Sequence, residues 1–115
     1  RGQLMAYRLN RKLVLEAPVQ AADGAGGFTN GWAALGTLWA NVAARTGREA
    51  AGVAAPLSRV AYRIVVRAAP FGSDARPKAN QRFRDGERLF LILAVAEDDA
   101  DARFLMCTAQ EETVA

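Results

Sequence analysis

Arginine accounts for most of the side chains whose type and spacing suit binding chemistry. Only Lys12 and Lys78 among the 15 basic residues are lysines. Arg59, Arg63 and Arg67 recur at every fourth position, so on a β-strand they share one face. Such a row attracts a phosphate backbone without recognising its base sequence. It predicts a groove or channel for a polyanion, the alternative being an ordinary solvated surface.

Charge is distributed unevenly along the chain, although the net charge is only +3. Arg82, Arg84 and Arg88 form a second basic group, and residues 97–101, EDDAD, form a compact acidic one. This asymmetry favours contact with a polyanion on one face, or head-to-tail contact between oppositely charged protein surfaces.

Catalytic chemistry has little support in the residues. The chain has no histidine, which removes the commonest general base and metal ligand. Its one cysteine, Cys107, lies in the apolar run RFLMCTA, so we expect a buried hydrophobic side chain with no disulfide. Residues 24–27, GAGG, lack the lysine and Ser/Thr of a phosphate loop, and residues 97–101 lack the calcium-loop pattern. We expect no enzyme activity, no metal and no cofactor.

Alternation of apolar and polar residues indicates the elements that must position these arginines. Strands are expected at 10–17, 37–45, 59–68 and 103–111, with a hairpin over 81–97 that turns at Asp85-Gly86. Long loops are expected at 18–31 and 46–58. The chain is therefore predicted to be one mainly β domain over 1–115, an antiparallel barrel or sandwich of five to six strands with long loops and at most a short helix.

Two features of this pattern indicate side chains that pack against another part of the fold or against a neighbouring subunit. Trp32 and Trp39 lie seven residues apart, but the glycines around them argue against a helix, and we expect core or interface anchors and no ligand cage. The run 88–96, RLFLILAVA, is apolar on both faces. Such a strand must be covered by another sheet face, a helix or a neighbouring subunit.

The order of short motifs resembles the head–tail joining family of tailed phages and gene transfer agents. The matching pieces are Gly26-Gly27, Trp32, the strand Trp39-Ala40-Asn41-Val42, the turn Gly47-Arg48-Glu49, a strand ending at Arg67, Arg82 before the hairpin at Gly86, and Leu105 with Cys107 in the last strand. Together they span about residues 9–111. Segments 50–57 and 97–101 match no part of the pattern.

The resemblance implies a small β-barrel without catalysis that forms a homo-oligomeric ring, a hexamer or dodecamer. This connector or stopper would sit in the head–tail neck of a virion or virus-like particle assembled in the bacterial cytoplasm. A portal or adaptor ring would lie above it, tail terminator or tail-tube proteins below it, and double-stranded DNA would pass through its lumen. No apolar run is long enough for a membrane-spanning helix, and we expect no membrane contact.

Within that expectation the candidate residues fall into two groups. Arg59, Arg63 and Arg67 are the candidates for facing the DNA channel. Docking to a neighbouring subunit or neck protein is assigned to Gly26, Gly27, Trp32, Trp39, Glu49 and Arg82. The loops 18–31 and 46–58 are expected to dock or to close the channel, with 46–58 favoured as the plug. The alternative function is an OB-like nucleic-acid-binding module, in which charge and exposed aromatic rings share one sheet.

Overall fold

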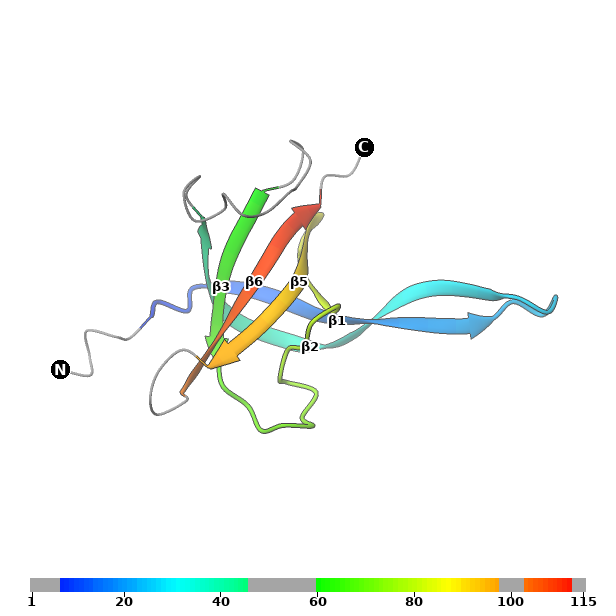
Figure 1. Cartoon of the computed structure of the whole chain (residues 1–115), viewed down its shortest axis with the longest axis horizontal. Helices are drawn as coiled ribbons and strands as arrows, with labels where there is room; N and C mark the ends of the chain where they lie inside the picture. The colour runs from blue at the N-terminus through cyan, green and yellow to red at the C-terminus, as the bar shows by residue number, and fades with distance from the viewer. Residues whose placement is uncertain (1–6, 46–59, 98–102, 113–115) are drawn as a thin grey trace.

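The fold is a six-stranded antiparallel barrel, seen in a computed structural model that describes residues 7–45, 60–97 and 103–112 (Figure 1). The strands are β1 (Arg11–Ala22), β2 (Phe28–Ala44), β3 (Val60–Arg67), β4 (Arg82–Asp85), β5 (Arg88–Glu97) and β6 (Phe104–Glu112). Their order around the barrel is β1-β2-β3-β6-β5-β4, and the pairing of β1 with β4 closes it. The prediction of a mainly β fold is confirmed. The expected plug segment 46–58 lies outside the described residues.

The core consists of the inward-facing residue of every second position on the strands. Leu13 and Leu15 of β1, Ile64 of β3, Phe83 of β4 and Phe90 of β5 are fully buried within it. Period-two alternation places these side chains on one face of each strand, and barrel closure brings the faces together. Cys107 lies in the same core, as expected from its apolar surroundings.

The first hairpin continues far beyond the barrel, where the sequence predicted a loop at 18–31. β1 and β2 stay paired from Ala17↔Ala33 to Ala22↔Phe28 and form a two-stranded arm, residues 17–33, that projects to one side (Figure 1). Pro18 is tolerated because each arm strand has a free edge, where a missing N–H breaks no ladder. The loop prediction was wrong because small residues, glycine and proline hide the alternation that marks a strand.

The turn of the arm explains the glycines at 24–27. The Asp23 side chain accepts hydrogen bonds from the amides of Ala25 (2.8 Å) and Gly27 (3.0 Å). These bonds lower the pKa of the exposed Asp23 carboxyl. Gly24 and Gly26 have φ of 82° and 88°, a conformation that side chains with a Cβ rarely adopt. The glycines therefore form a tight turn and no phosphate site.

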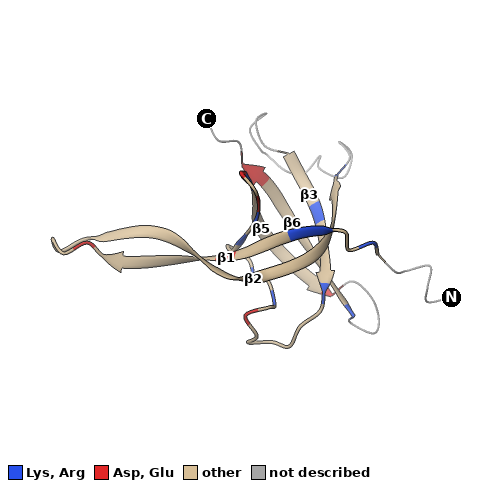
Figure 2. Ribbon diagram, turned by 180° about the vertical axis from the view of Figure 1, so that it is seen from behind, with Lys and Arg blue, Asp and Glu red and all other residues tan. Residues whose placement is uncertain are grey.

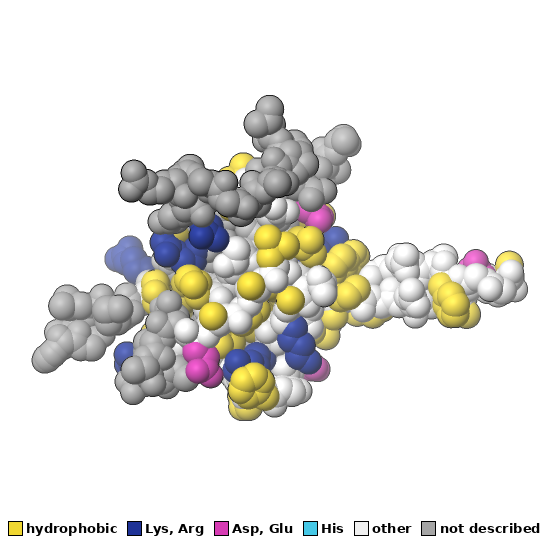
Figure 3. Space-filling view, viewed as in Figure 1, with side chains coloured by type: hydrophobic (Ala, Val, Ile, Leu, Met, Phe, Trp, Pro, Cys, Tyr) yellow, Lys and Arg dark blue, Asp and Glu magenta, His cyan; other side chains and the backbone are white. Residues whose placement is uncertain are grey.

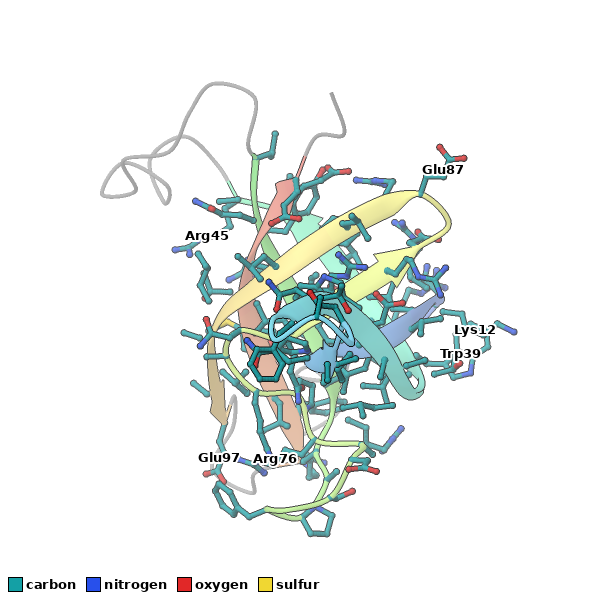
Figure 4. The ribbon with its side chains drawn as sticks, turned by 90° about the vertical axis from the view of Figure 1, so that its right-hand side faces the viewer. Lys12, Trp39, Arg45, Arg76, Glu87 and Glu97 are labelled. Carbon is teal, nitrogen blue, oxygen red and sulfur yellow. The ribbon has the colours of Figure 1, made fainter. Side chains whose placement is uncertain are left out.

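The second hairpin forms where it was expected but turns one residue later. Asp85 pairs with Arg88, so the two turn residues are Gly86 and Glu87. Gly86 has φ of 63°, whereas Glu87 does not have a positive φ. Positive φ at the first position alone is typical of a type II′ turn, and glycine is the residue that this position favours. Glu87 projects into solvent from the end of the hairpin (Figure 4).

The two faces of β5 have different environments. Phe90 and Ile92 are fully buried in the core. On the outside, Leu91 is half-buried, Leu93 is 41% exposed, and Ala94 and Ala96 are exposed. A bulge between Ile92 and Ala94 displaces Leu93 from the regular pairing with β6. The barrel thus covers one apolar face of β5, and no described part of the chain covers the other.

Candidate functional site

A buried carboxylate lies where the arm leaves the barrel. Glu16 is 6% exposed, although it is on the outer side of β1. The Nε atoms of Arg82 and Arg84 each donate a hydrogen bond to one of its oxygens, both at 2.7 Å. Burial raises the pKa of Glu16, but the hydrogen bonds from Arg84 and Arg82 outweigh it, and the pKa is lowered. Glu16 is thus ionised and binds two arginines of β4.

Trp32 covers this network from the arm. The guanidinium carbon of Arg82 lies 4.0 Å from the centre of the Trp32 ring, which is a close cation–π contact. Because Pro18 pairs with Trp32 and Glu16 pairs with Arg82, the ring lies two residues along β1 from the carboxylate. The structure therefore joins two residues that the sequence proposed for docking, Trp32 and Arg82. Both are used here to attach the arm to the barrel.

Glu16 itself was not among the predicted site residues. Its partners are 66 and 68 positions away in sequence, and only the pairing of β1 with β4 brings them together. Arg11 and Asp85 form a further ion pair across the same pair of strands. The one sequence signal was an acidic residue within the apolar run 13–19, LVLEAPV.

The third arginine of the hairpin is also neutralised. Arg88 donates from Nε and Nη2 to the two carboxylate oxygens of Glu111, at 2.7 and 3.0 Å, and from Nη2 to the Tyr62 hydroxyl at 3.1 Å. The hydrogen bond from Arg88 lowers the pKa of Glu111, and the same contact raises the pKa of Arg88. The Tyr62 ring packs edge-on against Phe90, with centroids 5.1 Å apart. Arg82, Arg84 and Arg88 are therefore all held in ion pairs of the barrel wall.

Arg63 and Arg67 differ from those three. Both are exposed on the outer face of β3, as the two blue bands on that strand in Figure 2 show. Within the described ranges neither has a carboxylate partner; the Arg67 guanidinium lies 5.8 Å from the Phe104 ring centre. The expected sharing of one face by these two residues is confirmed. Arg59, the third of the row, lies outside the described residues.

A shallow hollow adjoins Arg63. It has a volume of about 270 Å³ and is lined by Arg45, Arg63, Met106 and Thr108. In Figure 3, dark-blue side chains gather at the upper left of the barrel. The strands that supply them are neighbours, since Arg63 pairs with Thr108 of β6 and with Ala43 of β2. The outer face of β2, β3 and β6 is therefore a basic surface.

The remaining docking candidates are dispersed. Gly26 and Gly27 lie in the turn at the far end of the arm. Trp39 is 54% exposed on the barrel, with the Lys12 ammonium 5.8 Å from its ring centre, and the two side chains project together in Figure 4. Trp39 follows Trp32 by seven positions on β2, roughly 23 Å along the strand, so the tryptophans do not form a ligand cage. Glu49 lies outside the described residues.

The described residues offer little for catalysis or metal binding. No group of three or more Asp, Glu or Cys side chains in them could hold a metal ion. Burial raises the pKa of the Cys107 thiol to about 12, so it stays protonated and is a poor nucleophile. No helix in this part of the chain has the length and hydropathy that a membrane crossing needs.

Comparison with known proteins identifies relatives along nearly the whole chain. The family model of the phage head completion protein matches residues 4–112. A chain in the virion of a native gene transfer agent particle has 50% sequence identity and a TM-score of 0.77; the match covers 96% of this chain and 100% of that one. A solution structure of a Shigella flexneri 2a protein has the same fold at 23% identity, with a TM-score of 0.69 over 94% of this chain and 96% of that one. No curated protein matches the chain.

Proposed function

Because this chain belongs to the phage head completion protein family, we propose that it forms a ring in the head–tail neck of a phage-like particle, through which DNA passes. The protein is a structural head–tail component of a virion, in agreement with its 50% identity to a chain of a native gene transfer agent virion. The ring, the channel and the docking contacts are the further steps of the proposal. That identity over the full length of the related chain is the observation that carries it.

The channel is assigned to the basic surface of β2, β3 and β6. Arg63 and Arg67 are exposed and unneutralised by described carboxylates, whereas the three hairpin arginines are bound to Glu16 and Glu111. Free guanidinium groups on a lumen wall attract DNA phosphates and impose no sequence preference. Such weak, non-specific contact suits a channel through which DNA of any sequence must pass.

Docking is assigned to the arm and to Trp39. The arm projects from a molecule whose longest extent is 59 Å, against 34 and 23 Å in the other two directions. Trp39 is exposed on a barrel whose other large aromatic side chains are mostly packed, and exposed tryptophans are common anchors of protein interfaces. The partners proposed are portal or adaptor proteins on one side, tail proteins on the other, and further copies of this chain within the ring.

The proposed role involves no catalysis, and two observations support this. The family is one of structural virion proteins. The single thiol is buried and protonated, and the carboxylates of Glu16 and Glu111 are held by arginines in the barrel wall.

The OB-like alternative requires aromatic rings beside the free arginines. Phe83 and Phe90 are fully buried, and Tyr62 packs on Phe90, so these rings are core partners as expected. Phe104, beside Arg67, is 8% exposed. Trp39 of the neighbouring strand β2 is exposed, but the cation at its ring is Lys12 and not Arg63 or Arg67. Because one exposed ring does not make a row of stacking rings, the neck role has the better support.

Gene deletion in cells that produce the particle tests the role. We expect filled heads and free tails to accumulate separately, and the wild-type gene to restore joined particles, as counted by negative-stain electron microscopy. Joined, infective or DNA-delivering particles that form without the protein would refute it.

Charge reversal tests the channel separately. Arg63→Glu with Arg67→Glu should leave joined particles in normal number but reduce DNA retention or delivery, measured by nuclease-protected DNA per particle. Lys78→Glu is the matched control, because it reverses an exposed charge in a loop outside the basic surface. Equal DNA retention in both variants would contradict the assignment of Arg63 and Arg67.

A further inference from the structure

The surface of the arm has almost no charged side chains, which suits contact with protein better than contact with solvent. Between Ala17 and Ala33 the only charged residue is Asp23, whose carboxylate binds the turn's own amides. Figure 3 shows the arm as a slender projection with acidic atoms near its far end and no basic ones. A two-stranded ribbon without a hydrophobic face to pack on is marginally stable in water. The arm is therefore expected to be covered in the assembled state.

One face of the arm continues the core face of the barrel. Leu13 and Leu15 face the core, and the same alternation leads to Ala17, Val19 and Ala21 beyond it. Val19 is 43% exposed. Beside it is a hollow of about 350 Å³ lined by Pro18, Val19, Gln20, Asn30, Gly31 and Trp32. Pro18 pairs with Trp32 and Gln20 pairs with Asn30, so these four side chains lie on the opposite face of the ribbon from Val19, and the hollow opens between the two pairs.

A matching protrusion lies on the barrel of the same chain. We call the outer side of β5, with Leu91, Leu93, Ala94 and Ala96, the β5 patch. It carries no charged side chain, and the bulge at Leu93 places an isobutyl group 41% in solvent. In Figure 3 the hydrophobic atoms of this face lie in front, over β5 and β6 and beside the base of the arm. The patch cannot be covered by its own arm, which extends away from the barrel (Figure 1).

We propose that the arm of one copy lies on the β5 patch of the next copy in the ring, with Leu93 of that copy seated in the arm's hollow. This inference rests on the proposed ring. The two surfaces lie at different places on one chain, so the contact is head-to-tail, the type that closes into rings. Both surfaces are uncharged and mainly apolar, so a partner with a charged docking surface would leave its charges without counterparts there.

The dimensions of the arm predict that copies join only during assembly. Six paired residues of β1 extend about 20 Å, and a two-stranded ribbon is about 10 Å wide, which gives a footprint of roughly 200 Å². Stable complexes bury roughly 800 Å² on each partner. A single arm contact is therefore weak in dilute solution, whereas a neighbouring ring that aligns the copies stabilises every contact of the closed ring at once.

Site-directed cross-linking in whole particles tests the contact. Gln20→Cys at the hollow and Ala94→Cys beside Leu93 are combined in one chain, and purified particles are treated with a short bismaleimide. Both positions are exposed, and the native Cys107 is buried and unreactive. We expect a ladder of bands at multiples of the mass of a single chain on a denaturing gel. The control pair, Gln20→Cys with Lys78→Cys, should give no ladder, and each single variant none.

Every other outcome overturns the proposal. If the protein is in the particles but the Gln20/Ala94 pair gives no ladder, or the control pair gives one equally, the arm does not lie on the β5 patch, and the neck role is unaffected. A band joining Gln20→Cys to a different particle protein would assign the arm to that protein. If the chain is absent from purified particles, the proposed function fails together with this inference.

Discussion

The guanidinium of Arg82 lies between the Trp32 ring of the arm and the Glu16 carboxylate of the barrel wall, with its carbon 4.0 Å from the ring centre. The arm and the closing strand β4 are therefore fastened by one cation. Glu16 also accepts a hydrogen bond from Arg84. Removing any member of this layer is expected to weaken both the position of the arm and the closure of the barrel.

Replacing Trp32 with alanine should loosen the arm more than the barrel. The cation–π contact of a partly exposed ring contributes about 1 kcal/mol, and we expect the free energy of unfolding to fall by about that amount. Hydrogen exchange should accelerate at amides of residues 17–33 and stay unchanged in β3 and β6. Urea denaturation and hydrogen-exchange mass spectrometry measure the two effects.

Trp39→Ala is the control for this change. Trp39 is more exposed, and its cation, on Lys12, lies 5.8 Å from the ring, so a smaller loss of stability and no effect on the arm are expected. Equal acceleration of arm exchange in both variants would show that Trp32 does not fasten the arm.

Glu16→Gln should destabilise the barrel strongly, although the substitution hardly changes the shape of the side chain. The amide keeps the shape but replaces one acceptor oxygen by a donor that faces an arginine, and it leaves two guanidinium groups without a counter-charge. Hydrogen bonds to charged groups contribute about 1.5–3 kcal/mol, and we expect a loss of about 2–3 kcal/mol in urea denaturation. Glu112→Gln, on a half-buried residue at the end of β6, is the control and should change stability by less than about 0.5 kcal/mol. A loss at Glu16 no larger than this would contradict the role of the network.

Stability should be lost at acid pH, and the sign follows from two lowered pKa values. Glu16 and Glu111 both have folded-state pKa values below the usual 4.5. The folded protein therefore holds these protons less tightly than the unfolded chain, so the stabilisation is complete above about pH 4.5 and disappears as pH falls through the lowered values.

Melting temperature against pH measures this dependence. Without histidine, and with the pKa of Cys107 raised to about 12, we expect an almost constant melting temperature between about pH 6 and 9 and a fall below about pH 4.5. The double variant Glu16→Gln with Glu111→Gln should be less stable at neutral pH and show a shallower acid fall. An acid fall equally steep in both proteins would place the responsible carboxylates elsewhere.

Cys107 should be unreactive in the folded protein. It is fully buried between the core residues of β3 and β5, and its thiol stays protonated at neutral pH. We expect Ellman's reagent to modify it only on unfolding, at a rate that follows global unfolding, and to react at once in guanidinium chloride. Rapid labelling of the native protein would show that β6 opens locally.

Alternation along the chain was sufficient to predict β3, β6 and the second hairpin with its core residues. In these segments large apolar side chains occur at every second position, and burial of one face depends on little else. The exposure of Arg63 and Arg67 on one face of β3 followed from the same period. The order of the glycine, tryptophan and arginine motifs also indicated the family correctly.

The arm, the turn position and the Glu16 network depended on pairing between distant segments. Residues 17–33 are mostly small or turn-forming and carry no strand period, so their strand state comes from pairing with each other. The register of β4 on β5 determines which residues of the segment Asp85–Arg88 form the turn. The sequence also could not show which arginines form ion pairs and which stay exposed, because every arginine carries the same charge. Only barrel closure, which sets Glu16 beside β4 and Glu111 beside Arg88, holds three of them in ion pairs and leaves Arg63 and Arg67 exposed.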